Sequence, residues 1–349
     1  MVKKSFHNFL EQIQNTQRQA IEQVERVQSD RLQDFDYQED PPKMIAIDGS
    51  NRWIWNNPDI NARIAIIRTA YVVYEFNSDF SPPMQILNQG SQDEAVLIAP
   101  DNPNIHTYDQ DFQKLHTEIQ RIIGRKNPLG ETLSLLRSLA EFKMVEELAS
   151  NYTESLIVMD GALTYVQIKE FEDTIRNIVK ACKKNNNILI GVSKRNITRW
   201  LGSELTDEAV MREIARNDQK MMYMDIPTIP KSQQKFPSIG KTYLAKLHAK
   251  PVKTFRVDIY NPLNVNDNKV LSHLAYYSQV NTFPGYPFPL VDAHTIAALL
   301  RRVPDMYNHE LLEVGIQLGF TEDELLQYMI THENMETDPF HRYLDDATR

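Results

Sequence analysis

Apolar side chains at alternating spacings of three and four mark the N-terminal part of the chain as one long helix. The apolar stripe is formed by Leu10, Ile13, Ala20, Val24 and Val27, with Gln17 completing the series. This pattern predicts a helix over residues 7–34, which the acidic, proline-bearing stretch 34–43 brings to an end. Because the stripe is narrow, it fits a helix lying on the domain surface as well as one that pairs with a second subunit or another partner.

From Met44 onward the pattern changes to short apolar, β-branched runs that alternate with helical periodicity. Strands are expected at residues 43–51, 63–76, 94–100, 155–163, 187–196 and 254–260. Helices are expected at residues 131–150, 171–184, 206–221 and 271–280. Strands that alternate with helices and end in polar residues are typical of a mixed α/β sheet, in which ligand sites lie at the strand ends.

The C-terminal part predicts further helices. Residues 285–302, GYPFPLVDAHTIAALLRR, change from a proline-rich stretch into an apolar helix, and the Thr-Glu-Asp-Glu sequence at Thr321 is a capping box that opens a last helix. The sequence contains no internal repeat and no convincing linker. We therefore expect an N-terminal helix in residues 1–40, one α/β domain in residues 41–305 and a helical tail in residues 306–349.

The composition is that of a globular protein. Of 349 residues, 42% are hydrophobic and 24% charged. No apolar run approaches the roughly 20 residues of a membrane span, and the first residues lack the apolar stretch of a signal peptide, so a cytoplasmic protein without membrane contact is expected. The single cysteine, Cys182, excludes disulfides within the chain and cysteine-based zinc sites. A metal would therefore be held by oxygen or imidazole ligands.

The charge is unevenly distributed. With 38 Lys and Arg against 47 Asp and Glu, the net charge of −9 argues against a protein that coats nucleic acid over its whole surface. Residues 226–257 nevertheless carry seven basic side chains and no acidic one: Lys231, Lys235, Lys241, Lys246, Lys250, Lys253 and Arg256. Interleaved with Phe236, Tyr243 and Phe255, these fit a surface that follows nucleic-acid phosphates and stacks on bases; the alternative is a solvated loop with incidental charge.

Two aspartates stand directly before glycine at the ends of apolar strands. One such Asp-Gly pair, at Asp48 or at Asp160, would be an ordinary turn. Two at equivalent strand ends predict carboxylates that converge at the rim of one sheet, where they repel each other unless a cation lies between them. The sequence contains no phosphate-binding loop of the P-loop type and no G-x-G-x-x-G loop.

Further candidate groups lie near these strand ends. The preceding helix offers Glu141, Glu146 and Glu147, of which Glu141 lies in the most apolar surroundings. Lys194 follows a strand and could bind a phosphate oxygen. Asp292 could cap a helix or act in the site, and His294 could be a metal ligand or a proton donor.

Taken together, the segments IAIDGSN, IVMDGAL, GVSKRN, FRVDIY and GYPFPLVDAH occur in an order that resembles the NurA nuclease domain. The resemblance spans residues 44 to about 302, and its last motif is the most specific. It implies an RNase H-like mixed sheet flanked by helices, a homodimer, manganese-dependent cleavage of DNA, and cooperation with a HerA-type hexameric ATPase. The implied activity is that of a 5′–3′ exonuclease and single-strand endonuclease in double-strand break repair and end resection.

The same resemblance assigns roles by position. It implies catalytic roles for Asp48, Glu141, Asp160, Lys194, Tyr286, Asp292 and His294. Glu146 is the alternative to Glu141. Of these residues, Asp48, Glu141, Asp160 and His294 would hold Mn²⁺, or Mg²⁺. The resemblance assigns no role to the basic segment; its six lysines, Lys231, Lys235, Lys241, Lys246, Lys250 and Lys253, are expected to contact DNA on the strength of their charge. Two other functions remain open at this stage: a non-catalytic adaptor of a DNA-translocating ATPase and an actin-like ATPase.

Overall fold

The structure is a computed structural model, and it describes residues 2–24, 32–57, 62–80, 84–98, 117, 121, 129–194, 206–215, 219–226, 236–250, 253–299 and 302–329. The strands are β1 (Gln33–Phe35), β2 (Met44–Asn57), β3 (Ala62–Phe76), β4 (Met84–Ile98), β5 (Leu156–Asp160), β6 (Ile188–Ser193), β7 (Met221–Asp225), β8 (Lys241–Lys246) and β9 (Phe255–Tyr260). The helices are α1 (Val2–Val24), α3 (Leu129–Asn151), α4 (Lys169–Asn185), α5 (Asp207–Ile214), α6 (Asp267–Tyr276), α7 (Phe288–Ala297), α8 (Arg302–Gln317) and α9 (Glu322–Met329).

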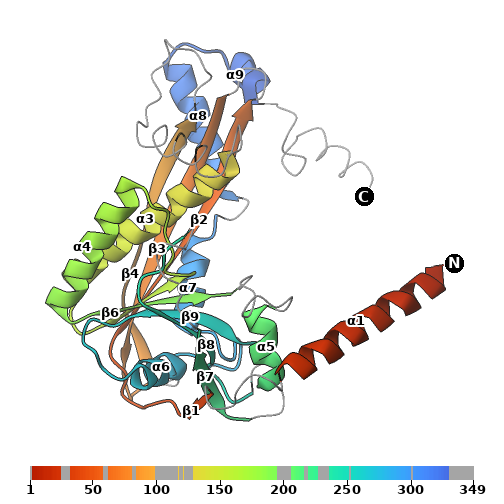
Figure 1. The fold of residues 1–349 in the computed structure, drawn as a ribbon. Coiled ribbons are helices and arrows are strands. Elements are labelled where there is room, and N and C mark those ends of the chain that lie inside the picture. Colours follow the sequence, from red (N-terminus) through yellow and green to blue (C-terminus); the bar gives the residue numbers. More distant parts are fainter. Residues whose placement is uncertain are drawn as a thin grey trace. The chain divides into compact units, whose positions relative to one another are not determined.

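Within these residues, nine strands form one sheet in the order β1-β7-β8-β9-β6-β5-β2-β3-β4 (Figure 1). Strands β2, β5 and β6 pair in parallel, whereas β9 is antiparallel to β6 and β8, and β7 is antiparallel to β8 and β1. The central strands read as continuous apolar runs because both of their faces are covered. The mixed α/β sheet with flanking helices that the sequence predicts is confirmed.

The contacts divide the chain into two units. The first comprises Met1–Ile47, Val72–Gln89 and Val145–Ala293, and the second comprises Asp48–Tyr71, Gly90–Met144 and His294–Arg349. In the first unit, α5 packs on β7 and β8 through an apolar cluster formed by Val210, Met211, Ala215, Met222, Met224 and Leu244.

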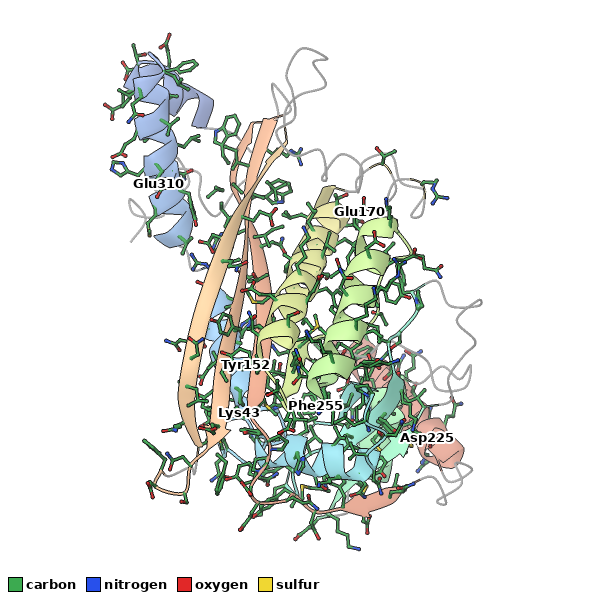
Figure 2. All side chains as sticks on the ribbon, turned by 90° about the vertical axis from the view of Figure 1, so that its left-hand side faces the viewer. Lys43, Tyr152, Glu170, Asp225, Phe255 and Glu310 are labelled. Atoms are coloured by element: carbon green, nitrogen blue, oxygen red, sulfur yellow. The ribbon has the colours of Figure 1, made fainter. Side chains whose placement is uncertain are left out.

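Helices α3 and α4 lie side by side (Figures 1 and 2). The buried side chains of α4 are Phe171, Thr174, Ile175, Ile178 and Cys182, a spacing of three and four that forms one apolar face. The helix ends where Asn186 adopts a left-handed conformation, with φ of 56°. Asn177 of α4 donates to the carboxylate of Glu146 on α3 at 3.0 Å, which links the two helices on their polar side.

In the second unit, α8 is tied to the sheet by a polar cluster. Arg68 on β3 donates two hydrogen bonds of 2.6 Å to the carboxylate of Asp93 on β4. The hydroxyl of Tyr307 on α8 donates to the same carboxylate. This arrangement holds the pKa of Asp93 below its usual range, chiefly through the hydrogen bond from Arg68.

Several predicted elements differ from the structure. The N-terminal helix ends, as far as it is described, at Val24 rather than at residue 34, and residues 33–35 form β1; Val27 lies outside the described residues. The helix expected over residues 206–221 ends at Ile214, because the methionine-rich run from Met221 joins the sheet as β7. Strand β8 lies in a segment for which no strand was expected from the sequence. In the described part of the chain, no helix is both long and apolar enough to cross a membrane.

Candidate metal centre

Asp48 and Asp160 occupy equivalent positions on neighbouring parallel strands. The paired residues of β2 and β5 run as far as Ile47 and Met159, and each aspartate is the next residue of its own strand. The preceding apolar residues of both strands are buried, which fixes the register because a slip by one residue would turn these side chains to the opposite face. Both aspartates were expected from the sequence to end their strands at the rim of one sheet. Asp160 does end β5, whereas β2 continues to Asn57, so Asp48 lies within its strand and the expected strand end at this position is wrong.

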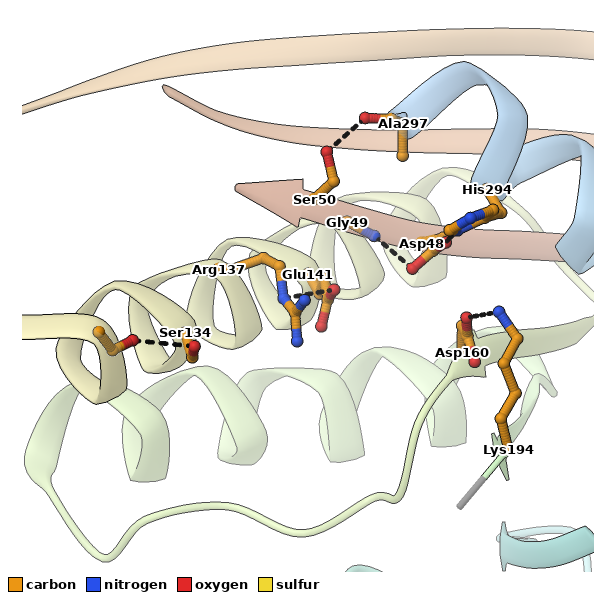
Figure 3. A network of polar contacts seen from close by, with 11 residues as sticks. Asp48, Gly49, Ser50, Ser134, Arg137, Glu141, Asp160, Lys194, His294 and Ala297 are labelled. Carbon is orange, nitrogen blue, oxygen red and sulfur yellow. Dashed lines mark hydrogen bonds and ion pairs between the residues drawn. The ribbon is translucent and has the colours of Figure 1, made fainter. Parts of the chain in front are cut away.

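Asp48 is buried and held from two sides (Figure 3). Only 5% of its surface is exposed. One carboxylate oxygen accepts the backbone N–H of Gly49 at 2.7 Å, and the other lies 2.6 Å from Nδ1 of His294. The imidazole of His294 is more than half exposed, so this pair leads from a buried carboxylate to the solvent.

The position of His294 is fixed by contacts between β2 and the end of α7. Ser50 donates from its hydroxyl to the carbonyl of Ala297 at 2.6 Å, and Arg52 donates to the carbonyl of Leu299 at 3.1 Å. Carbonyls at a helix C-terminus lack partners within the helix, and a cation there is favourable to the helix dipole. Strand β2 therefore supplies both Asp48 and the side chains that anchor the helix carrying His294.

Glu141 lies against Gly49, the residue next to Asp48. The side chain projects from α3, only 6% of the residue is exposed, and Nε of Arg137 lies 3.5 Å from its carboxylate (Figure 3). A Cβ atom built on Gly49 would stand 2.5 Å from Oε1 of Glu141, so only glycine leaves room for this carboxylate. Glu146 instead accepts the amide of Asn177 on α4. The geometry therefore favours Glu141 over Glu146 as a partner of Asp48.

Asp160 pairs with Lys194. The ammonium of Lys194 lies 2.5 Å from the carboxylate of Asp160 and 5.1 Å from the ring centre of Tyr286. The ring of Tyr286 in turn packs on Phe255, with 5.4 Å between the ring centres. The ammonium of Lys253 donates to the backbone carbonyl of Lys194. Asp160 thus contacts Lys194, and Lys194 in turn contacts Tyr286 and Lys253.

The ligand atoms of Asp48, Asp160 and His294 lie within 4.8 Å of one another. Ligand atoms bound to one Mg²⁺ at about 2.1 Å are at most roughly 4.2 Å apart, so small side-chain movements would bring these atoms onto a single divalent ion. Two carboxylates with one imidazole are a donor set for Mg²⁺ or Mn²⁺. The buried carboxylate of Glu141, beside Gly49, adds an oxygen next to this group. The residues present therefore fit a divalent metal ion.

Asp292 faces a different partner from His294. Its carboxylate accepts the hydroxyl of Tyr74 on β3. Residues two apart on an α-helix point about 200° away from each other, so the two side chains cannot share one face of α7. Burial, followed by the hydrogen bond to Asp292, raises the pKa of Tyr74. Sequence reasoning missed Tyr74, because an aromatic residue inside a β-branched run reads as ordinary core.

The lysines of the basic segment have diverse surroundings. Lys241 and Lys250 are both exposed, and Lys241 pairs with Asp267 at 2.8 Å. Lys253 donates to the backbone carbonyl of Lys194. Lys246 is only 3% exposed, so it is not placed for a surface contact with DNA, contrary to the expectation from sequence. The remaining predicted members, Lys231 and Lys235, lie outside the described residues.

Comparison with known proteins places this geometry in context. A model of the NurA domain family matches residues 42–299. Among solved structures, the NurA nuclease from Sulfolobus solfataricus superposes with a TM-score of 0.54 at 17% identity, covering 90% of this chain and 98% of that one. Two Endonuclease V structures score below 0.5, a range from which we draw no conclusion. The catalytic domain of the human enzyme scores 0.39 at 10% identity, covering 88% of this chain and 99% of that one. The Ciona intestinalis enzyme with bound DNA scores 0.31 at 11% identity, covering 81% and 95%. A search of curated proteins gives no match.

Proposed function

This chain belongs to the NurA domain family, and on that basis we propose that it is a divalent-metal-dependent deoxyribonuclease. One observation of the molecule itself carries the proposal: ligand atoms of Asp48, Asp160 and His294 lie within 4.8 Å of one another. The fold shared with a Sulfolobus protein described as a nuclease supports it.

Asp48, Asp160 and His294, together with Glu141, would hold Mn²⁺ or Mg²⁺. The bound ion would supply Lewis-acid activation of water and charge stabilisation at the phosphodiester. Imidazole among the ligands favours Mn²⁺ somewhat over Mg²⁺. The hydrogen bond from Nδ1 of His294 to Asp48 fixes the orientation of the ring, and the N–H of Gly49 fixes that of the carboxylate.

Lys194 would neutralise negative charge on the phosphoryl oxygens. In the structure its ammonium is held between the carboxylate of Asp160 and the ring of Tyr286, so it is aimed at the same strand end as the proposed ion. A cation held in place in this way stabilises developing charge without reorganisation. Lys253, through its bond to the carbonyl of Lys194, would hold Lys194 in place and bind a neighbouring phosphate. Asp292 and Tyr74 would form a second hydrogen-bonded pair on the opposite side of α7.

We further propose the finer activity that the family resemblance implies: 5′–3′ exonuclease and single-strand endonuclease cleavage during double-strand break repair. Work as a homodimer with a HerA-type ATPase belongs to the same proposal. The exposed apolar side chains of α1 support a role for this helix in such contacts, since Phe6, Phe9 and Leu10 are each more than half exposed. We propose the N-terminal segment of residues 1–40, which contains α1, as the contact segment, and a cytoplasmic location for the protein.

The proposal is tested by cleavage of end-labelled single-stranded and blunt duplex DNA with Mn²⁺, Mg²⁺ or EDTA. The wild-type protein is expected to cleave with metal and to lose cleavage in EDTA, and Asp48→Ala and Asp160→Ala are expected to be inactive with unchanged circular dichroism. Lys183→Ala, on the exposed surface of α4, is the control variant and should retain full activity. Equal cleavage by the wild-type protein and Asp48→Ala would sink the proposal. Absence of cleavage both alone and with a HerA-type ATPase would favour the adaptor function.

A further inference from the structure

A fully buried carboxylate lies in the middle of β9, outside the group of proposed metal ligands. Asp258 has no exposed surface, although the strand around it, FRVDIY, is otherwise mostly apolar. A buried carboxylate is costly unless hydrogen bonds satisfy it. An acidic side chain at this position therefore needs partners that account for it.

The carboxylate of Asp258 joins three segments of the chain. One oxygen accepts the backbone N–H of Leu163 at 2.9 Å. The other accepts the hydroxyl of Thr242 on β8 at 2.6 Å and Nε of Arg256 at 3.0 Å. Thr242 and Arg256 lie on neighbouring positions of the sheet, whereas Leu163 lies in the loop that follows β5. Asp258 is therefore the link between this loop and the strands β8 and β9.

The loop of residues 161–163 begins directly after Asp160 and lies flat on β6. The N–H of Gly161 donates to the carbonyl of Val192 at 2.9 Å. A Cβ atom at Gly191 would stand 2.6 Å from the carbonyl oxygen of Gly161 and 3.0 Å from the nitrogen of Leu163, so glycine is needed for this close approach. Gly191 is also the residue paired with Asp258 across the two strands.

The cross-strand pair thus has two complementary parts. The missing side chain of Gly191 makes room for the loop, and the carboxylate of Asp258 holds the loop by the N–H of Leu163. On the far side, the carbonyl of Leu163 accepts the N–H of Ile239 at 2.9 Å. Asp160 lies three positions before Leu163, directly ahead of the loop that Asp258 and Gly191 hold in place.

We propose that Asp258 is a positioning residue, which orients the carboxylate of Asp160 for a divalent metal ion by fixing the loop of residues 161–163. The proposal rests on the function proposed above, in that it takes Asp160 to be a metal ligand. Outer hydrogen bonds of this kind hold ligands in the geometry that the ion requires, and their loss typically weakens metal binding about 10- to 100-fold.

The test compares three variants of the full chain by Mn²⁺ titration calorimetry and by amide hydrogen exchange. Asp258→Ala removes the acceptor of the Leu163 N–H. Asp258→Asn retains an oxygen for that N–H. Thr242→Val is the matched control, because it removes another hydrogen bond to the same carboxylate without touching the loop.

Asp258→Ala is expected to speed exchange of the amides in residues 161–165 and to weaken Mn²⁺ binding about tenfold or more. Asp258→Asn and Thr242→Val are expected to stay within about threefold of the wild-type affinity. A merely structural role would lower the unfolding temperature without this selective loss. Wild-type affinity in a folded Asp258→Ala protein would overturn the proposal. So would a tenfold loss in Asp258→Asn at wild-type stability, since that variant keeps the loop contact.

The two proposals fail in different ways. If the protein binds Mn²⁺ in an Asp160-dependent manner but cleaves no DNA, the proposed nuclease activity is contradicted. The positioning role of Asp258 is then still decided by the Mn²⁺ affinity of Asp258→Ala. Protein in which Asp160→Ala leaves Mn²⁺ binding unchanged overturns the positioning role, whatever the cleavage assay shows.

Discussion

A methyl group added at Gly49 tests how tightly the candidate centre is packed. In Gly49→Ala the new Cβ would stand 2.5 Å from Oε1 of Glu141, where ordinary contacts begin at 3.4 Å, so the oxygen must retreat by 3.4 − 2.5 = 0.9 Å. The new Cβ would also stand 2.9 Å from Cγ of Glu141, so the whole side chain must shift, and the free energy of unfolding should fall by about 1 kcal/mol. Misplacement of a catalytic group by about 1 Å can cost about 100-fold in rate.

We therefore expect Gly49→Ala to fold normally and to lose about 100-fold in kcat for DNA cleavage at saturating Mn²⁺. A time course of cleavage of labelled single-stranded DNA measures kcat, and urea unfolding measures the free energy of unfolding. Gly130→Ala is the matched control, since a Cβ at Gly130 meets nothing within 4 Å and should leave kcat unchanged.

A double-mutant cycle identifies the group through which the methyl acts. If Gly49→Ala lowers kcat by displacing Glu141, it should lower kcat little further in a Glu141→Ala background, because the displaced carboxylate is already absent there. A full additional 100-fold loss in that background would refute the reasoning, and so would wild-type kcat in the single Gly49→Ala variant.

Three further predictions concern other parts of the chain. Burial raises the pKa of Cys182 to about 12, so the thiol should react with a disulfide reagent at pH 8 only after unfolding; rapid reaction of the folded protein would contradict its burial. Asp93→Asn should lower the free energy of unfolding by about 1 kcal/mol at pH 7. Since Arg68 lowers the pKa of Asp93 in the folded protein, the difference in unfolding free energy between wild type and Asp93→Asn should shrink as the pH falls below about 4. A difference that grows as the pH falls would contradict this prediction. Lys253→Ala should weaken DNA binding and reduce its salt slope by about one, whereas Lys183→Ala should change neither.

The strands could be predicted from the sequence where an apolar run is followed by a charged residue. Residues before Asp48 and Asp160 read clearly as buried strands, and both are strands. The run that starts at Met221 could not be read in the same way, because methionine favours helices and a fully buried strand shows no alternation. Lys246 illustrates the same difficulty, since its charge suggests the surface although the structure buries it in β8.

The candidate site was predictable to the extent that Asp48 and Asp160 each directly follow a buried apolar run, although only Asp160 ends its strand. The geometry around Glu141 depends on the depth of α3 against Gly49, which spacing along the chain does not contain. Asp258 carried one readable signal, an acidic residue inside an apolar strand, but its partner Leu163 is 95 residues away in the sequence. The orientation of Asp292 away from His294 follows from the helical period once the start of α7 at Phe288 is known.

The most direct measurement is anomalous diffraction at the manganese absorption edge from crystals grown with Mn²⁺. The account predicts a strong anomalous peak within bonding distance of Asp48, Asp160 and His294, and its loss in crystals of Asp160→Ala. A peak bound by other residues, or none at millimolar Mn²⁺, would contradict the assignment of these three residues as the metal centre.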